Sequence, residues 1–161
     1  SGAVAILLRH SKCVSEPKPL LLGGIARTDS SANCLCEGDA VNSGLDMRTD
    51  ATALLEAGIS LSKEGWGQFK TTMHWNEATP NHIITHQVGL QHQKRLYEAL
   101  NLDNTKDFST FPFLGNTGSV ALPISLCLAE EANRFKMGDT VLLLGIGSGL
   151  STLMLGVLWQ K

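Results

Sequence analysis

The sequence predicts an α/β domain in which helices pack on a mixed β-sheet. Short apolar runs, such as Ala3–Leu8 and Thr140–Leu144, are typical of buried strands. In a longer segment, Met47–Phe69, apolar residues recur mostly at three- and four-residue spacings, as on the buried face of a helix. The runs and the helical segments alternate, and the predicted order of elements is β-α-β-α-β-β.

The N-terminal part is predicted to hold two strands and a long loop. Ala3–Leu8 is the first expected strand, and it begins at the third residue of the sequence. We therefore expect residues 1–12 to be the last strand of a preceding half, and residues 13–161 to form one domain. Leu20–Ile25 is the second expected strand, and the stretch Thr28–Gly44, rich in Gly, Ser, Asn and Asp, is expected to be a loop.

The first long helix is expected to begin after Asp46, whose carboxylate can accept a hydrogen bond from a free N–H of the first turn. Its apolar stripe starts at Met47, and Gly65 and Gly67 are positions where it is expected to be interrupted or to end. A helix that starts near Ser119 tolerates Pro123 in its first turn. The other expected elements are strands His82–Thr85, Thr140–Leu144 and Thr152–Trp159, and helices Gln91–Leu100 and Ser119 to about Asn133.

Composition excludes several classes of protein. A chain of 161 residues is long enough for one domain with a sizeable core. Its formal net charge of -2 gives no support to nucleic-acid binding, which normally needs a basic surface. The longest apolar runs are broken, and they are shorter than the roughly 20 residues that span a membrane. No export signal is recognised, so we expect a cytoplasmic protein.

The cysteines do not predict a metal site. Cys34 and Cys36 are separated by one residue rather than the two to four that are typical of zinc ligands. Neither begins a helix after a strand, where a thiolate is stabilised. We therefore expect no metal, and we expect reduced thiols at Cys13, Cys34, Cys36 and Cys127.

Two polar motifs that each follow an apolar run are the candidate site. His86 follows the predicted strand His82–Thr85, and Asn116 lies in the motif Gly115–Gly118. A neutral imidazole and a carboxamide can each donate one hydrogen bond to the same anionic oxygen. Taken singly, a structural histidine and a helix-capping or turn-forming asparagine remain the alternatives.

A glycine-rich turn near the C-terminus, Gly145–Gly149, is the third motif. It does not fit a dinucleotide-binding fingerprint, because Leu150 stands where that motif has its third glycine and a strand follows instead of a helix. A tight turn that exposes the N–H of Ser148, between Gly147 and Gly149, is one interpretation. An ordinary glycine-rich hairpin is the other.

Taken together, these segments resemble the C-terminal half of β-ketoacyl-acyl-carrier-protein synthase III enzymes of the thiolase superfamily. The matching segments are THQ at 85–87, FLGNTGSVALPISL at 113–126 and KMGDTVLLLGIGSGL at 136–150. MRTDATALLEAG at 47–58, THQVG and GIGSGL look more like the branch that joins two long acyl-CoA chains head to head in olefin biosynthesis. His-Gln-Val-Gly at 86–89, where synthase III usually has His-Gln-Ala-Asn, favours the same branch.

The resemblance implies a thiolase-like fold and a Cys–His–Asn triad. His86 and Asn116 correspond to the residues that polarise a thioester carbonyl. Ser148, with Gly147 and Gly149, corresponds to the turn whose N–H completes the oxyanion hole. The nucleophilic cysteine is expected in the N-terminal half, outside this chain. The implied substrates are acyl-CoA or acyl carrier protein, with no cofactor, and a homodimer is expected.

The predicted function is therefore acyl transfer by Claisen condensation of acyl thioesters, in fatty-acid or long-chain olefin biosynthesis. We expect the complete protein to be the enzyme, and residues 1–161 alone to be inactive. The alternative is a non-catalytic thiolase-like module that binds an acyl group or a partner protein. Neither interpretation includes nucleic acid or a membrane span.

Overall fold

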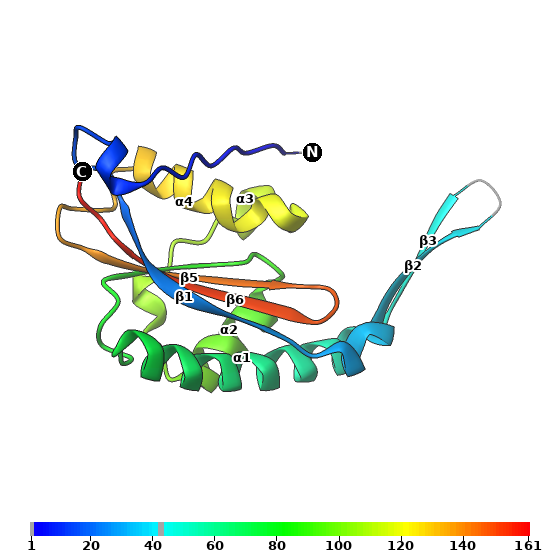
Figure 1. The fold of residues 1–161 in the computed structure, drawn as a ribbon. Coiled ribbons are helices and arrows are strands. Elements are labelled where there is room, and N and C mark those ends of the chain that lie inside the picture. The colour runs from blue at the N-terminus through cyan, green and yellow to red at the C-terminus, as the bar shows by residue number, and fades with distance from the viewer. Residues whose placement is uncertain (1, 42–43) are drawn as a thin grey trace.

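The centre of the molecule is a four-stranded sheet in the order β1-β6-β5-β4 (Figure 1). The computed structural model describes residues 2–41 and 44–161. β6 is antiparallel to both of its neighbours, whereas β4 is parallel to β5, so the predicted mixed sheet is confirmed. The strands are β1 (Leu20–Thr28), β4 (His82–Thr85), β5 (Thr140–Gly147) and β6 (Ser151–Leu158).

Helices cover both faces of this sheet, which gives the three layers seen in Figure 1. Side chains alternate along β5: Leu142 and Leu144 pack with the helices on one face, and Val141 and Leu143 pack on the other. This two-residue period explains why the strand is apolar throughout. The helices are α1 (Ala51–Met73) and α2 (Leu90–Leu100) on the first face, α4 (Ala121–Glu131) on the second, and the one-turn α3 (Phe111–Leu114) before α4.

Helix α1 begins later than predicted. Asp50 is its N-cap residue, and Asp50 Oδ1 accepts a hydrogen bond from the Ala53 N–H at 2.9 Å. Asp46 and Met47 instead lie in a strand, β3 (Gly44–Thr49), so their assignment to this helix was wrong. Residues of β3 pair with a neighbouring strand, and this pairing delays the start of the helix.

Gly65 and Gly67 do not interrupt α1. A Cβ atom at Gly65 would lie 3.2 Å from Met154 Cε and 3.3 Å from Thr152 Cγ2. Glycine at this position therefore allows the helix to lie close against β6. At Gly67 a Cβ would meet nothing within 4 Å, because this residue faces away from the sheet.

The predicted loop Thr28–Gly44 contains regular structure. A 3₁₀ helix, η2 (Ser30–Leu35), is followed by β2 (Cys36–Val41), which pairs with β3 as an antiparallel hairpin. The hairpin projects from the body of the molecule (Figure 1). Its composition resembles that of a loop because the hairpin is built by backbone pairing and carries no apolar run.

The expected strand Ala3–Leu8 is not formed in this chain. Residues 2–10 are irregular and exposed, with Leu7 83% accessible. They run beside α4 and not along the sheet, and a Cβ at Gly2 would lie 3.5 Å from Val120 Cγ2 (Figure 1). An apolar run forms a strand only where a partner strand satisfies its backbone, and no described strand pairs with this one. The assignment of residues 1–12 to a preceding half stays a prediction.

The two remaining predicted helices are confirmed. α2 starts one residue before the predicted position, and α4 is preceded by the short 3₁₀ helix η4 (Gly118–Val120). Two further 3₁₀ helices are η1 (Ser11–Cys13) and η3 (Asn104–Lys106). Among the described residues, no helix combines the length and the apolar character that a membrane span requires.

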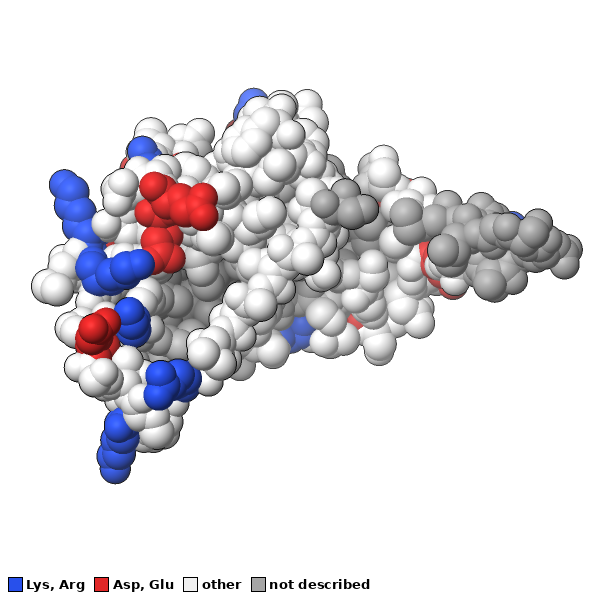
Figure 2. All heavy atoms as spheres, turned by 90° about the horizontal axis from the view of Figure 1, so that it is seen from above, with Lys and Arg blue, Asp and Glu red and all other residues white. Residues whose placement is uncertain are grey.

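Charged side chains on the face above α4 gather at one end of the molecule (Figure 2). Both signs occur there (Figure 2). Ion pairs between the two signs include that of Lys161 Nζ with Glu130 Oε1 at 2.7 Å. Among the described residues, the rest of this face is largely uncharged (Figure 2). This mixed distribution agrees with the small net charge and differs from the single-sign surface of a nucleic-acid-binding protein.

Candidate functional site

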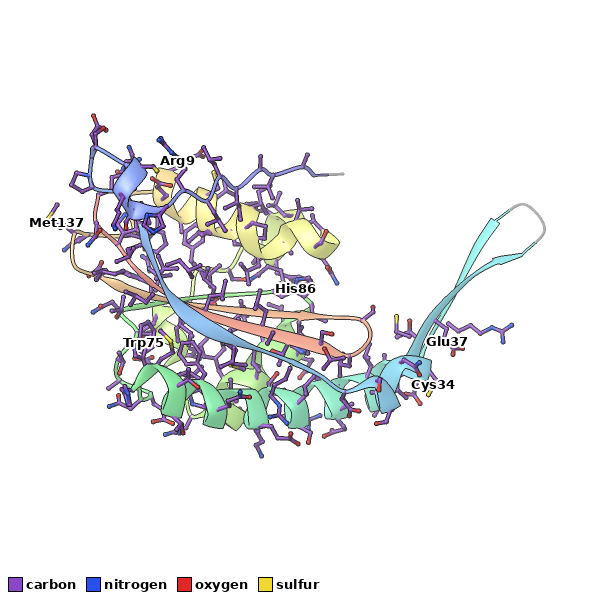
Figure 3. All side chains as sticks on the ribbon, in the orientation of Figure 1. Arg9, Cys34, Glu37, Trp75, His86 and Met137 are labelled. Carbon is purple, nitrogen blue, oxygen red and sulfur yellow. The ribbon has the colours of Figure 1, made fainter. Side chains whose placement is uncertain are left out.

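His86 is the first residue after β4 (Figure 3). Its backbone N–H donates to the carbonyl oxygen of Leu144 at 2.8 Å, which continues the parallel pairing of β4 with β5. The side chain is half-buried, and burial lowers the pKa of His86 below that of a free imidazole. At neutral pH the ring is therefore mostly uncharged and keeps one N–H that can donate to a carbonyl oxygen.

A second histidine lies beside His86. His92, the third residue of α2, lines the same small cavity of about 10 Å³. Burial, with a smaller contribution from the charge of His86, lowers the pKa of His92 to about 4. The other lining residues are Ser62, Leu96, Leu144, Gly145, Ile146, Thr152 and Met154.

His92 was not among the candidate site residues predicted from the sequence, and its proximity to His86 was missed. The available signal was its position in the first turn of the helix that follows β4. A helix that folds back onto the sheet after a strand brings its first turn near the end of that strand.

Asn116 lies in a turn between α3 and η4. Gly115 has φ 65° and ψ −158°, and Gly118 has φ 65°, conformations that favour glycine on both sides of the asparagine. Asn116 Oδ1 accepts a hydrogen bond from the Gly118 N–H at 2.9 Å. Its side-chain oxygen is thereby engaged within the turn, so the NH₂ group is the part of the amide available to a ligand. Asn116 is exposed and is not the cap of α4, which is Val120.

The turn that holds Ser148 joins β5 to β6. Ser148 and Gly147 are exposed, whereas Leu150 is buried against Leu61 of α1. Leu150 and Asp29 exchange two backbone hydrogen bonds, of 2.8 and 2.9 Å, so the turn is attached to the end of β1. The turn is a glycine-rich hairpin, as one interpretation of the sequence expected, and its exposed residues remain accessible to a ligand.

One cysteine lies next to this turn. Ser148 Oγ donates a weak hydrogen bond to Cys36 Sγ at 3.8 Å, and Thr49 Oγ1 donates to the same sulfur at 3.6 Å. Cys36 begins strand β2 and does not begin a helix. The four cysteines are unpaired.

The three predicted segments come to the same end of the sheet. His86 lies beside the end of β5, and Ser148 lies in the turn that follows β5. A Cβ at Gly145 would lie 3.8 Å from Leu122 Cδ1, so the start of α4, which Asn116 precedes, covers this end of the strand. Within residues 2–41 and 44–161, no hydrogen bond joins His86, Asn116 and Ser148 directly, and no cluster of three or more potential metal ligands is present.

Comparison with known proteins identifies the family that the sequence motifs resemble. Residues 72–159 match the family described as 3-Oxoacyl-[acyl-carrier-protein (ACP)] synthase III C terminal. The chain is 36% identical to an acyl-CoA:acyl-CoA alkyltransferase of Shewanella oneidensis, with 99% of this chain and 48% of that protein covered. It is 34% identical to the alkyltransferase of Xanthomonas campestris, with 98% and 45% covered.

A solved structure shows the same fold. OleA of Xanthomonas campestris, with bound lauric acid and lauroyl-CoA, superposes with a TM-score of 0.81 at 33% identity. The superposition covers 88% of this chain and 41% of that chain. The chain thus spans about half the length of the curated relatives that it matches. The match to the family over residues 72–159 and the identity over nearly the whole chain show that it belongs to the synthase III C-terminal family of the thiolase superfamily.

Proposed function

We propose that this chain is the carbonyl-activating part of an acyltransferase that condenses two acyl thioesters. The observation that carries the proposal is His86, a half-buried and uncharged donor at the end of β4. The family membership supports it, and so does the identity to acyl-CoA:acyl-CoA alkyltransferases over almost all of this chain. The identity favours the branch that uses two acyl-CoA molecules, as in long-chain olefin biosynthesis.

In the proposed reaction, His86 and Asn116 act on the second thioester. One N–H of the imidazole and one N–H of the amide donate to its carbonyl oxygen. Negative charge develops on this oxygen as the neighbouring carbon loses a proton to a general base of the complete enzyme, or loses carbon dioxide when the thioester is malonyl, and an enolate forms. That carbon attacks the acyl group of the acyl-enzyme, a carbon–carbon bond forms, and the cysteine thiolate leaves. Each such donor contributes about 10²–10³-fold in rate in characterised enzymes.

The Ser148 turn is proposed to act on the acyl-enzyme. Its backbone N–H, together with the N–H of the nucleophile, stabilises the oxyanion that forms during acyl transfer. We place the nucleophilic cysteine outside this chain, because none of the four cysteines begins an α-helix of the structure. Cys36 contacts Ser148 of the turn, so it is the cysteine of this chain with which the assignment can be tested.

The proposed partners follow from the same chemistry. The substrates are acyl-CoA or an acyl carrier protein, and the complete enzyme is proposed to be a cytoplasmic homodimer. The proposed reaction uses a cysteine nucleophile, side-chain donors and backbone N–H groups, so the proposal includes no cofactor.

The test uses the complete protein that contains this chain. It is incubated with two long-chain acyl-CoAs or with malonyl-carrier protein and an acyl-CoA, and products are identified by mass spectrometry. We expect a condensation product from wild type, and losses of about 10²–10³-fold in rate for His86→Ala and for Asn116→Ala. Matched controls are His74→Asn and Asn104→Ala, which change exposed residues away from the site and are expected to keep full activity.

Two results would contradict the proposal. The first is condensation that is unimpaired in both His86→Ala and Asn116→Ala. The second is an acyl group found by mass spectrometry on Cys36, or loss of the product in Cys36→Ala. Binding of acyl-CoA by wild type without any product would identify a non-catalytic acyl-binding module instead.

A further inference from the structure

Gln87 is buried directly after the candidate catalytic histidine. Gln87 is only 3% exposed, although its carboxamide can take part in four hydrogen bonds. A buried amide costs free energy unless its donors and acceptors find partners. The partners of Gln87 therefore indicate what this side chain does.

The amide of Gln87 joins two separate segments. Gln87 Nε2 donates to the carbonyl oxygen of Thr85 at 2.8 Å and lies 3.4 Å from Thr85 Oγ1. Gln87 Oε1 accepts from Ser109 Oγ at 2.8 Å and from the Phe111 N–H at 3.1 Å. We call these contacts the Gln87 bridge; it connects the end of β4 to the residues that lead into α3.

The segment reached by the bridge is also fixed on its other side. Thr110 and Ser125 are both buried, and their hydroxyl oxygens are 2.7 Å apart. Ser125 Oγ donates in turn to the carbonyl oxygen of Ala121 at 2.7 Å, so Thr110 is attached to α4. The residues around Thr110 are thus held between β4 and α4.

Asn116 is connected to this segment by the single helical turn α3. The Gly115 N–H donates to the carbonyl oxygen of Phe111 at 3.0 Å, which closes α3 immediately before Asn116. A change in the position of Phe111 is therefore passed on to Asn116. His86 is the neighbour of Gln87 in the chain, so the bridge links both candidate donors.

We propose that Gln87 is a positioning residue that sets the relative placement of His86 and Asn116 through its hydrogen bonds to Thr85, Ser109 and Phe111. This inference rests on the proposed function, in which both side chains donate to one oxygen. Two donors stabilise the same developing charge only when both point at it, and a misplacement of about 1 Å can cost about 10²-fold in rate. Gln87 touches neither substrate nor reacting atoms in this role.

The test compares Gln87→Leu with Gln91→Leu in the complete protein. Leucine approximates the size of glutamine without its hydrogen bonds, and Gln91 is exposed on α2, so it is the matched control. For Gln87→Leu we expect kcat to fall about 10–10²-fold with KM nearly unchanged, since the bridge orients donors and does not bind substrate. Gln91→Leu is expected to keep both constants.

A double-mutant cycle separates the bridge from general destabilisation. Ser109→Ala removes one donor to Gln87 Oε1 and leaves the Phe111 N–H in place, so it is expected to reduce kcat less than Gln87→Leu does. The double variant is expected to be no slower than Gln87→Leu alone, because both changes break the same contact. Additive losses, or a folded Gln87→Leu protein with the kcat of wild type, would overturn the proposal.

A readout that needs no activity keeps this proposal separate from the proposed function. Amide hydrogen exchange at Phe111–Gly118 is expected to be faster in Gln87→Leu than in wild type and unchanged in Gln91→Leu. Unchanged exchange in Gln87→Leu would refute the bridge whatever the assay shows. Faster exchange in a protein without condensation activity would support the bridge and count against the proposed function alone.

Discussion

The Tyr97 hydroxyl donates a hydrogen bond to Asp107 Oδ1 at 2.6 Å and thereby joins α2 to the segment that follows it. Gln93 Nε2 donates to the second carboxylate oxygen, also at 2.6 Å. Asp107 forms a parallel bridge with Ile83 of β4, so these contacts tie the helix to the edge of the sheet. They fix the position of α2, which carries His92, relative to β4, which is followed directly by His86.

The protonation of Asp107 is expected to affect stability. Burial raises its pKa above the ordinary 3.8, although the hydrogen bonds from Tyr97 and Gln93 act in the opposite direction. The folded state therefore binds this proton more tightly than the unfolded state, and the contribution of Asp107 to stability falls as the pH rises from about 3.8 through the raised pKa. Asp107→Asn removes this dependence.

The measurement is urea unfolding of wild type and Asp107→Asn at a series of pH values. The difference in unfolding free energy between the two is expected to shift in favour of the variant as the pH rises through this window. A difference that is independent of pH would show that the carboxyl is not destabilised by burial.

His92 is expected to have the opposite pH dependence. Its pKa of about 4 in the folded state lies below the ordinary 6.5, because of burial and of the neighbouring His86. The unfolded chain therefore binds more protons between these values, and stability is lost as the pH falls from 6.5 to about 4, by up to roughly 3 kcal/mol. In His92→Leu this loss is expected to be absent, as urea unfolding from pH 7 to pH 4 will show. Parallel profiles for the two proteins would contradict the prediction.

Substitution by alanine at two glycines of α1 is expected to change the stability of the protein in opposite directions. Gly65→Ala places a methyl group about 3.2 Å from Met154 Cε and is expected to cost about 1–3 kcal/mol through overpacking. Gly67→Ala meets nothing within 4 Å and is expected to stabilise the helix by up to about 1 kcal/mol. Thermal unfolding of both variants tests this pair, and equal effects would be inconsistent with the close packing of α1 on β6.

Gly115 is expected to be required for the backbone of the Asn116 turn. Its φ of 65° and ψ of −158° are strained for any residue with a Cβ, whereas the space around it is open. Gly115→Ala is therefore expected to cost about 1–3 kcal/mol through the backbone alone. Urea unfolding measures this cost, and Gly67→Ala is the control for adding a methyl group in open space. A neutral effect at Gly115 would show that the turn relaxes without strain.

The sheet and its helices could largely be predicted from the sequence. β4, β5 and β6 are apolar runs bounded by turn residues, and their patterns are local. The start of α1 was misplaced because Asp46 and Asp50 are both plausible caps, and the choice depends on pairing between β2 and β3. Ala3–Leu8 was predicted as a strand from its composition, but a strand also needs a partner, which composition does not reveal.

The site could be predicted only in part. His86, Asn116 and Ser148 could be selected as candidates because each lies in a short polar motif next to an apolar run, which is a feature of the chain itself. Their roles remain predictions. His92 and Gln87 could not be selected in this way, because their contacts are with residues far away in the sequence or in another element. Gln87 contacts residues more than twenty positions later, and no periodic pattern links them.

The attachment of the Ser148 turn to β1 has a consequence for how the protein tolerates change. The two hydrogen bonds between Asp29 and Leu150 use backbone atoms only, whereas the Asp29 side chain caps η2 by accepting from Ser31. The attachment of the turn therefore does not depend on the identity of the side chain at position 29. Proline is the exception, since it removes the donated N–H. A saturation library at position 29 should therefore reject proline and favour residues that can still cap η2, Asp, Asn, Ser and Thr, while the geometry of the Ser148 turn stays the same in all of these variants.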